Sequence, residues 1–325
     1  MKTIGLEEHF LTADVLQAWR DRDQRFTAPP AEDEMARRLA ELGGARLSAM
    51  ADTGLDVQVL SLTTPGVQNL PPGDAAALQT TCNDLVAETV RAHLGHLQGF
   101  ATLATPDPAQ AARELERAVT TLGLNGAMVF PRSRERSLDL PDFWPIFEAA
   151  AALNAPLYLH PQAPTPPVRA AYYSGFNDTV DFGFATYGVG WHYDAGVQLL
   201  RLILSGVFDR FPGLSVILGH WGEVVLFYLD RIDNLTAAAG LDRPFSEYFR
   251  GNVFVTPSGI FSQRYLRWAI EVVGVDRIMF STDYPFRFAP DGGSRRFLDE
   301  ADLTDGDREK IASGNWDRLC AGIRR

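Results

Sequence analysis

Short runs of β-branched and aliphatic residues alternate with longer amphipathic stretches along the whole chain. Several short runs have uninterrupted apolar centres, such as LSVILGH at 214–220, which is typical of parallel strands covered on both faces. The longer stretches repeat apolar residues three or four positions apart, the spacing of one helix face. We therefore predict an α/β fold with strands at 3–10, 57–63, 97–104, 125–130, 156–160, 214–220, 252–256 and 277–282.

Eight strands alternating with helices favour a (β/α)8 TIM barrel, which takes about 250 residues plus insertions. A doubly wound open sheet is the alternative, but no G-x-G-x-x-G follows any predicted strand. No repeat or linker divides the chain, so we expect residues 1–325 to form one domain. A long loop rich in aromatic residues is expected after the fifth strand, at 162–190, as a lid or a subunit contact.

Composition excludes several classes of protein. Thirty Lys and Arg against 41 Asp and Glu give a net charge of −11, which disfavours nucleic acid as a partner. Cys82 and Cys320 are too few for a disulfide framework. No apolar run approaches the roughly 18 residues of a membrane span. Two glutamates stand where a signal peptide would have its apolar centre, so we expect a cytoplasmic protein.

Polar residues stand at the ends of four predicted strands, where a barrel of this kind has its active site. These residues are Glu7-Glu8-His9, His160, His220 and Asp283. Residues two apart on a strand share a face, so Glu7 and His9 point together while Glu8 points away. Imidazole and carboxylate groups together suit Zn²⁺, Mn²⁺ or Fe²⁺, so the pattern predicts a divalent-metal site.

Other polar residues are expected to have lesser roles. His93 and His96 precede the third strand, on the opposite rim, and are expected to be structural. His192 closes the aromatic segment, and a place in the pocket is the less favoured interpretation of it. The arginine cluster at 132–136 is expected to be a solvated loop on the side of the active site.

Lysine chemistry is disfavoured. The chain has two lysines, Lys2 and Lys310, and neither ends an interior strand. A lysine-carbamate site with two metals is therefore excluded, and a Schiff-base mechanism is disfavoured. A site for one metal ion is the consistent prediction.

Motifs along most of the chain resemble the amidohydrolase-related decarboxylases. These enzymes include γ-resorcylate, 2,3-dihydroxybenzoate, 5-carboxyvanillate and aminocarboxymuconate-semialdehyde decarboxylases. The matching motifs are LEEHF at 6–10, LSLTTPGVQ at 60–68, LYLHP at 157–161, ILGHWGE at 217–223, DRID at 230–233, FSTDYPF at 280–286 and SGNWDRL at 313–319. LEEHF looks most like the hydroxybenzoate branch of this family.

The resemblance implies roles for particular residues. One divalent metal ion per chain, Zn²⁺ or Mn²⁺, would be held by Glu7, His9, His160 and Asp283. Catalysis would involve Asp283, His220 and Glu223. The substrate would lie against Phe286, Arg231 and the loop residues Thr63, Thr64 and Pro65. The resemblance also implies a homo-dimer or homo-tetramer, and in some relatives the equivalent of Arg231 comes from a neighbouring subunit.

The implied reaction is non-oxidative decarboxylation of an aromatic acid that resembles an ortho-hydroxybenzoate, through protonation of the ring carbon and loss of CO₂. The alternative is hydrolysis of a lactone or cyclic amide, with the same metal activating water and Asp283 as general base. A hydratase is a third enzymatic possibility. A catalytically silent binding subunit is disfavoured because all the matching positions are filled.

Overall fold

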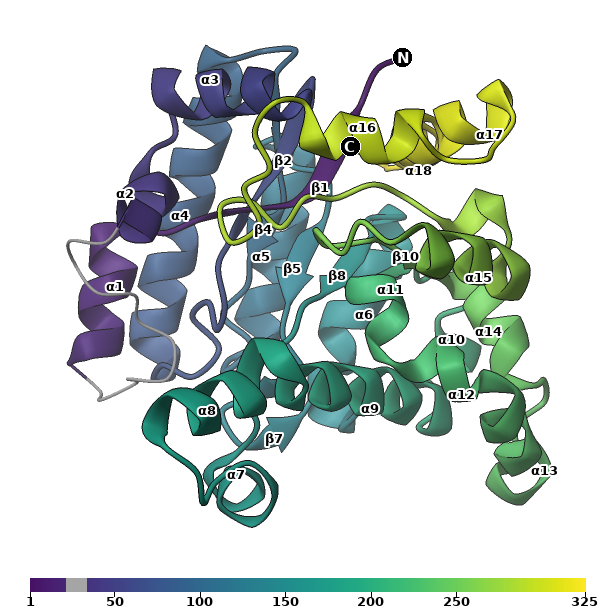
Figure 1. Cartoon of the computed structure of the whole chain (residues 1–325). Helices are drawn as coiled ribbons and strands as arrows, with labels where there is room; N and C mark the ends of the chain where they lie inside the picture. The colour runs from purple at the N-terminus through teal and green to yellow at the C-terminus, as the bar shows by residue number, and fades with distance from the viewer. Residues whose placement is uncertain (22–33) are drawn as a thin grey trace.

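The computed structural model describes residues 1–21 and 34–325 (Figure 1). The strands that form its sheets are β1 Ile4–Phe10, β2 Val57–Leu62, β3 Leu97–Gly99, β4 Ala101–Thr102, β5 Ala127–Val129, β8 Leu157–Leu159, β9 Val216–Leu218 and β10 Val253–Val255. All of them pair in parallel, and each lies within a predicted strand. A short antiparallel hairpin, β6 Arg132–Ser133 and β7 Arg136–Ser137, was not expected.

The third predicted strand is divided into β3 and β4, which belong to two neighbouring groups of strands. The order β1-β2-β3 joins the order β4-β5-β8-β9-β10 at Phe100, which separates β3 from β4. Phe100 N donates to Leu60 O (2.9 Å), and Ala101 N donates to Gly126 O on the other side (2.8 Å). Hydrogen bonding therefore continues across the break.

The eighth predicted strand, 277–282, is extended but irregular, and it closes the ring. Met279 N donates to Val255 O of β10 (3.0 Å), and Leu6 N of β1 donates to Phe280 O (3.1 Å). Farther along, His9 N donates to Tyr284 O (2.7 Å). The segment thus lies between the last and first strands, and the fold is a distorted TIM barrel.

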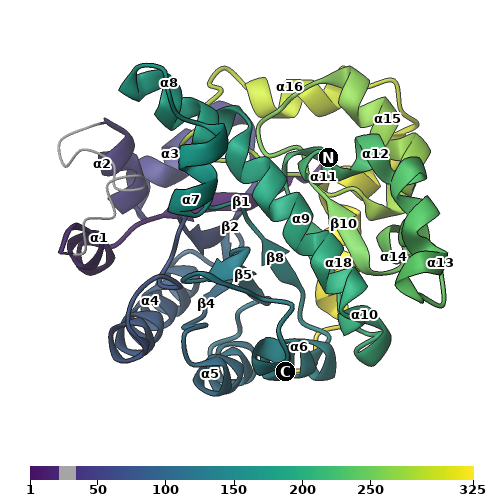
Figure 2. The ribbon, with the colours of Figure 1, turned by 90° about the horizontal axis from the view of Figure 1, so that it is seen from below.

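Helices alternate with the strands and surround them (Figures 1 and 2). They are α1 Ala13–Arg20, α2 Glu34–Ala40, α3 Gly44–Thr53, α4 Pro72–Ala92, α5 Pro108–Thr120, α6 Trp144–Leu153, α7 Pro166–Tyr172, α8 Asp178–Gly183, α9 Gly190–Leu204, α10 Val207–Arg210, α11 His220–Glu223, α12 Val225–Ile232, α13 Thr236–Ala239, α14 Phe245–Asn252, α15 Gln263–Val273, α16 Gly293–Asp299, α17 Asp305–Glu309 and α18 Asn315–Ala321. None of these described helices combines the length and hydropathy that crossing a membrane requires.

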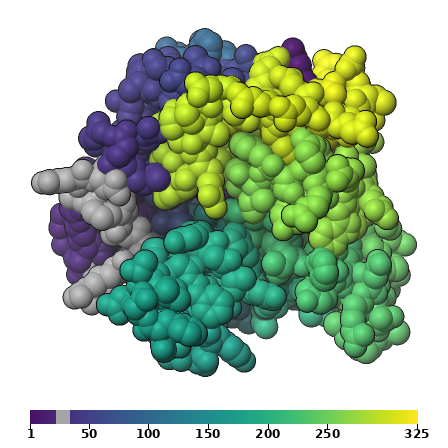
Figure 3. Space-filling view, in the orientation of Figure 1, coloured from purple at the N-terminus to yellow at the C-terminus, as the bar shows by residue number. Residues whose placement is uncertain are grey.

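The segment 162–190 is largely helical rather than the long loop that the sequence suggested. It contains α7, α8 and a π-helical turn at Phe184–Gly188. Asn177 caps α8 by accepting a hydrogen bond from Val180 N, which explains the helix start. Figure 2 shows α9, which follows directly, crossing in front of the central strands, and Figure 3 shows the segment in teal on the lower part of the molecule. Its aromatic side chains are mostly exposed, with Tyr172 73% exposed.

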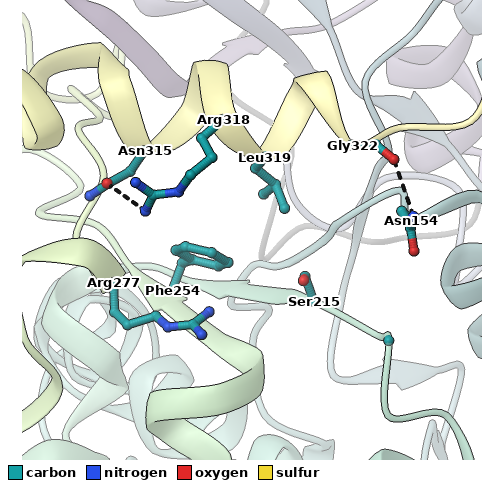
Figure 4. A pocket seen from close by; sticks show the side chains of 9 residues that line it. Asn154, Ser215, Phe254, Arg277, Asn315, Arg318, Leu319 and Gly322 are labelled. Atoms are coloured by element: carbon teal, nitrogen blue, oxygen red, sulfur yellow. Dashed lines mark hydrogen bonds between the residues drawn. The ribbon is translucent and has the colours of Figure 1, made fainter.

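The interior of the barrel is filled from its amino-terminal end. Phe100 lies edge-on to Trp316 of α18, with ring centroids 5.5 Å apart, and both side chains are buried. A cavity of about 280 Å³ lies outside the Phe100–Trp316 pair, between α18 and the starts of β9 and β10 (Figure 4). Ser215, directly before β9, and Arg277, at the start of the 277–282 segment, line this cavity. It therefore belongs to the rim opposite the strand ends that carry the predicted active site.

A buried arginine connects α3 to the first two strands. Arg46 donates from Nη2 to His9 O (2.6 Å), from Nε to Glu41 O (2.7 Å) and from Nη1 to Gln58 Oε1 (3.1 Å). Gln58 Nε2 in turn donates to Glu8 Oε2 (3.3 Å). Burial lowers the pKa of Arg46 to about 10, so the guanidinium stays charged at neutral pH. This network fixes the end of β1.

We expect Arg46→Met to lower the free energy of unfolding by about 2–4 kcal/mol, because two buried acceptors, His9 O and Gln58 Oε1, and the partly buried Glu41 O lose their donor. Urea denaturation in the presence of a chelator measures this change without a contribution from metal binding. The exposed Arg91 of α4 provides the control, since Arg91→Met is expected to change stability by less than about 0.5 kcal/mol. Equal stabilities of the two variants would contradict the role given to Arg46.

Candidate active site

The side chains predicted as metal ligands converge at the carboxyl ends of the strands. Glu7, His9, His160 and Asp283 each offer a ligand atom, and these atoms all lie within 4.8 Å of one another. Glu7 Oε1 is 3.0 Å from His160 Nε2, and His9 Nε2 is 3.5 Å from Asp283 Oδ1. Glu7 and His9 are fully buried, and Asp283 is 15% exposed at its side chain. The residues that the sequence grouped together are thus adjacent in space.

An irregularity in β1 aims two of these side chains. Gly5 pairs with Gln58 and Glu8 pairs with Leu60, so β1 contains one more residue than β2 between these pairs. Such a bulge changes the direction in which the following side chains point. Ile4 and Leu6 pack among apolar side chains inside the ring, while Glu7 and His9 reach the ligand cluster. The bulge therefore separates the packed interior from the site.

Glu8 points away from the cluster, as predicted. Its carboxyl group accepts from Thr282 N (2.9 Å) and from Thr282 Oγ1 (2.6 Å). Burial raises the pKa of Glu8 to about 8, although the Thr282 hydrogen bonds and the charge of Arg46 oppose this. Glu8 therefore ties β1 to the segment that carries Asp283.

Each ligand histidine is held from its outer side. His160 Nδ1 lies 2.8 Å from Pro161 O, and His9 Nδ1 lies 3.1 Å from Ser61 Oγ. A nitrogen that donates to a carbonyl leaves the other ring nitrogen free of a proton, so His160 presents the Nε2 lone pair to the cluster. Burial, and then the charge of His160, lowers the pKa of His9 to about 3. His9 is therefore neutral in the physiological range.

The two oxygens of Glu7 have different surroundings. Oε2 accepts from Tyr158 OH (2.6 Å) and from the hydroxyl of Ser258. Oε1 and His9 Nε2 are buried and have no hydrogen bond of good geometry to any described residue. Burial alone would raise the pKa of Glu7, but the neighbouring imidazoles of His220, His160 and His9 hold it well below its ordinary value. Buried ligand atoms left without partners fit a bound divalent cation.

Asp283 differs electrostatically from Glu7. Burial, followed by the charges of Glu7 and Glu8, raises the pKa of Asp283 well above its ordinary value. This direction reflects the protein groups alone, and the charge of a divalent cation would oppose it. A carboxyl group in such surroundings can hold a proton inside the site.

His220 and Glu223 form a pair beside the ligand cluster. His220 Nδ1 lies 2.6 Å from Glu223 Oε1, and His220 Nε2 lies 4.0 Å from Glu7 Oε1. All five residues from His220 to Val224 have positive φ, between +46° and +84°. A non-glycine residue in this region costs roughly 1–2 kcal/mol, and such strain is concentrated at functional sites. The turn is anchored by His220 N, which donates to Ser258 Oγ (2.9 Å), and by Trp221 N, which donates to Thr256 O (2.9 Å).

The predicted substrate-binding residues of the second loop lie beside the ligand-bearing strands. Thr63 N donates to the carbonyl oxygen of Phe10 (3.0 Å), the residue that follows His9. Thr64 Oγ1 donates to the carbonyl oxygen of Pro161 (2.8 Å), the residue that follows His160. Pro65 is the next residue of the loop after Thr64. Thr63 Oγ1 is buried and makes no hydrogen bond within the described residues. The loop thus borders the cluster.

An aromatic residue also borders the cluster from the eighth strand. The Phe286 ring lies 5.7 Å from that of His9, at an interplanar angle of 62°, and the residue is 42% exposed. The Phe130 ring lies 5.6 Å from that of His160. Flat apolar groups therefore lie beside both histidines of the cluster.

Arg231 and Arg132 have different surroundings. Arg231 is exposed on α12, and it is not among the residues that form the cluster in the described part of one chain. Arg132 is buried, because it pairs with Asp194 and donates to Ala163 O (2.7 Å). The solvated loop that was predicted at 132–136 therefore begins only at Arg134.

Two contributors were not identified from the sequence. His192 lies against Glu223, although the sequence did not favour a place for it in the pocket. Its position in the sequence gave no indication that it would contact Glu223. Tyr158 precedes His160 by two residues on the same strand, so the alternation of side chains could have placed its hydroxyl near the cluster.

The chain belongs to the amidohydrolase family, because its residues 8–319 match that family. It is 34% identical to a γ-resorcylate decarboxylase from Polaromonas sp., over 97% of each chain. Its fold matches the crystal structure of 5-carboxyvanillate decarboxylase from Sphingomonas paucimobilis with a TM-score of 0.90 and 35% identity, over 98% of this chain and 99% of the other. A dihydroxybenzoic acid decarboxylase from Polaromonas sp., with bound manganese and the inhibitor 2-nitroresorcinol, matches with a TM-score of 0.87 and 33% identity, over 98% and 97% of the chains.

Tyr158→Phe is expected to weaken binding of a divalent cation by about 10–100-fold, because Glu7 loses a donor that orients its carboxylate. Competition with a chelator of known affinity, using Zn²⁺ and Mn²⁺ separately, measures the change.

Tyr248→Phe is the matched control. Tyr248 is also buried and its hydroxyl also donates to a carboxylate, that of Asp209, but it lies outside the cluster. Its loss should leave metal affinity unchanged. Equal metal affinities of wild type and Tyr158→Phe would show that the hydrogen bond from Tyr158 to Glu7 does not determine metal binding.

Proposed function

We propose that residues 1–325 form one domain that catalyses metal-dependent, non-oxidative decarboxylation of a hydroxybenzoate. The observation that carries the proposal is the cluster of Glu7, His9, His160 and Asp283 beside the His220–Glu223 pair. Relatives of nearly equal length are named as decarboxylases of hydroxylated benzoic acids, which supports the same reaction class here. Bound manganese in one of them supports a divalent metal ion, Mn²⁺ or Zn²⁺, at this cluster.

The reaction exchanges a proton for CO₂ on one ring carbon. A divalent cation would be held by Glu7, His9, His160 and Asp283, and it would supply positive charge that stabilises the anionic substrate. Asp283 gives its proton to the ring carbon that bears the carboxylate. The bond from that carbon to the carboxylate then breaks, its electrons restore the aromatic ring, and CO₂ leaves. The net change is ArCOO⁻ + H⁺ → ArH + CO₂, so Asp283 must regain a proton in every turnover.

Other side chains orient the substrate. His220 presents Nε2 toward the cluster, and its Nδ1–H donates to Glu223, which fixes the ring. Nε2 can therefore accept the proton of the ortho hydroxyl and, once protonated, donate a hydrogen bond to the ortho oxygen. Phe286 lies against the face of the substrate ring, and the loop from Thr63 to Pro65 bounds the pocket. Holding the ring carbon near Asp283 lowers the entropic part of the barrier.

Hydrolysis of a lactone or cyclic amide is the alternative for the same groups, with Asp283 as general base. The named relatives support it less, because several that are 32–34% identical to this chain are named as decarboxylases. The experiment below separates the two reactions, since only decarboxylation releases CO₂.

The purified protein, loaded with Mn²⁺ or Zn²⁺, is expected to release CO₂ from at least one member of a panel of ortho-hydroxybenzoates. A chelator should abolish the release. Asp283→Asn should lower kcat by about 10²–10⁴-fold because the carbon loses its proton donor. Headspace CO₂ and chromatography of the decarboxylated phenol measure the reaction, and metal analysis of each variant accompanies them.

Asp302→Asn, at an exposed position, is the control and should keep wild-type turnover. Metal-loaded protein that opens lactones but releases no CO₂ would overturn the proposal in favour of hydrolysis. Near wild-type decarboxylation by Asp283→Asn would remove Asp283 as the proton donor.

We also propose that the active form is a dimer or tetramer in which Arg231 of one subunit completes the pocket of the next. The exposed position of Arg231 on α12 supports this, because a pocket-lining role then needs a second chain. A positive side chain there would pair with the carboxylate of an aromatic acid.

Arg231→Met is expected to be inactive as a homo-oligomer, since no site receives the guanidinium. A mixed oligomer of Arg231→Met and Asp283→Asn, co-expressed with different affinity tags, should recover activity, because one kind of site has an intact Asp283 and receives Arg231 from the other subunit. Sedimentation analysis checks the assembly. A monomeric active enzyme, or wild-type activity of Arg231→Met, would contradict the proposal.

A further inference from the structure

Two imidazoles share the buried carboxylate of Glu223. His220 Nδ1 lies 2.6 Å from Oε1, and His192 Nδ1 lies 2.6 Å from Oε2. Glu223 has no exposed side-chain surface, and only 13% of the His192 side chain is exposed. The two rings are 4.5 Å apart at an angle of 60°. Each oxygen of Glu223 therefore has its own imidazole.

His192 connects this carboxylate to the helical segment after β8. It lies in the first turn of α9, just beyond the π-helical turn at Phe184–Gly188. Its outer nitrogen, Nε2, is 3.0 Å from Trp191 Nε1 and 3.2 Å from Tyr187 O. A neutral ring accepts from the indole at this nitrogen, and a protonated ring donates to the carbonyl. In both states Nδ1 can keep its proton and donate to Glu223.

Hydrogen bonds explain this arrangement better than a second metal ion does. Ligands of one zinc ion, each about 2.0–2.2 Å from it, stand roughly 3 Å or more from each other. Both nitrogen–oxygen distances here are 2.6 Å, and they involve different oxygens of Glu223. Short contacts of this kind are typical of charge-assisted hydrogen bonds.

We infer that His192 is a positioning residue: it holds the second oxygen of Glu223, so that Glu223 stays fixed on the Nδ1 side of His220 and His220 Nε2 keeps facing the ligand cluster. The role in catalysis rests on the decarboxylation proposed above. Without His192, Oε2 of a fully buried carboxylate would lose its hydrogen bond, and Glu223 would be free to turn toward other donors. His220 would then lose its fixed orientation and tautomer.

Electrostatics supports the same role. Burial lowers the pKa of His192, but the charge and hydrogen bond of Glu223, with help from the Tyr187 carbonyl and the charge of Glu7, outweigh burial and raise it overall. The charges of His220 and His192 both lower the pKa of Glu223 against the effect of its burial. The Glu223 charge is therefore balanced from two sides.

Two variants at this position separate the hydrogen bond from the ring. Asn places a donor near the position of Nδ1, so His192→Asn can keep the contact with Glu223, whereas His192→Leu cannot. For His192→Leu we expect kcat to fall by about 10–100-fold with little change in KM, and for His192→Asn we expect most of kcat to be retained. His96→Leu, at an exposed site on the opposite rim, is the matched control and should match wild type.

A measurement independent of turnover tests the contact itself. Nitrogen-15 NMR of the histidine side chains in Zn²⁺-loaded protein reports which ring nitrogen of His220 carries the proton. Wild type and His192→Asn should show His220 protonated at Nδ1, and His192→Leu should show altered His220 signals. Unchanged His220 signals and unchanged kcat in His192→Leu would overturn the inference. If wild type released no CO₂ from any acid, the proposed function would fail, while the NMR comparison would still decide whether His192 orients His220.

Discussion

The site depends on the carboxylate of Glu7, which is buried and is not paired with a lysine or arginine among the described residues. Glu7 lies inside the barrel, where an uncompensated charge would cost several kcal/mol. Hydroxyl groups of Tyr158 and Ser258 satisfy one oxygen, and imidazoles surround the other. Because these groups come from different strands or from the chain directly after them, the charge of Glu7 is stabilised only when the ring of strands is closed. The fold and the metal site therefore form together.

The sequence was informative where chemistry and periodicity coincide. Parallel strands buried on both faces leave continuous apolar runs, so a polar residue at their ends is conspicuous, as with His160 and His220. The two-residue spacing of Glu7 and His9 correctly placed both in the cluster. The bulge in β1 was not predictable, because it depends on how β1 pairs with β2 and not on a residue type. Helices in 162–190 were missed because prolines and glycines made the segment look like a loop.

His192 illustrates a further limit of sequence reasoning. Its neighbours in the chain are aromatic residues of an irregular segment, whereas its partner, Glu223, follows the sixth strand. Only the path of α9 across the strand ends brings the two together (Figure 2). The left-handed turn from His220 to Val224 is equally invisible in the sequence, because four of its five residues are not glycine. Its backbone strain is offset by hydrogen bonds to the segment after β10, so the pair is held in place by a neighbouring strand.

The helical segment at 162–190 is attached to the site at both of its ends. Before it, Pro161 O holds the imidazole of His160, and after it, His192 holds Glu223. Its outer surface meanwhile exposes aromatic side chains such as Tyr172 and Phe176. A molecule that binds this surface and favours one arrangement of the segment changes the affinity of the site for its cation and substrate. By thermodynamic linkage, binding of the cation or substrate changes the affinity of the outer surface for that molecule by the same factor. If a second chain binds this segment, association of the chains and binding of ligands in the active site are therefore coupled equilibria.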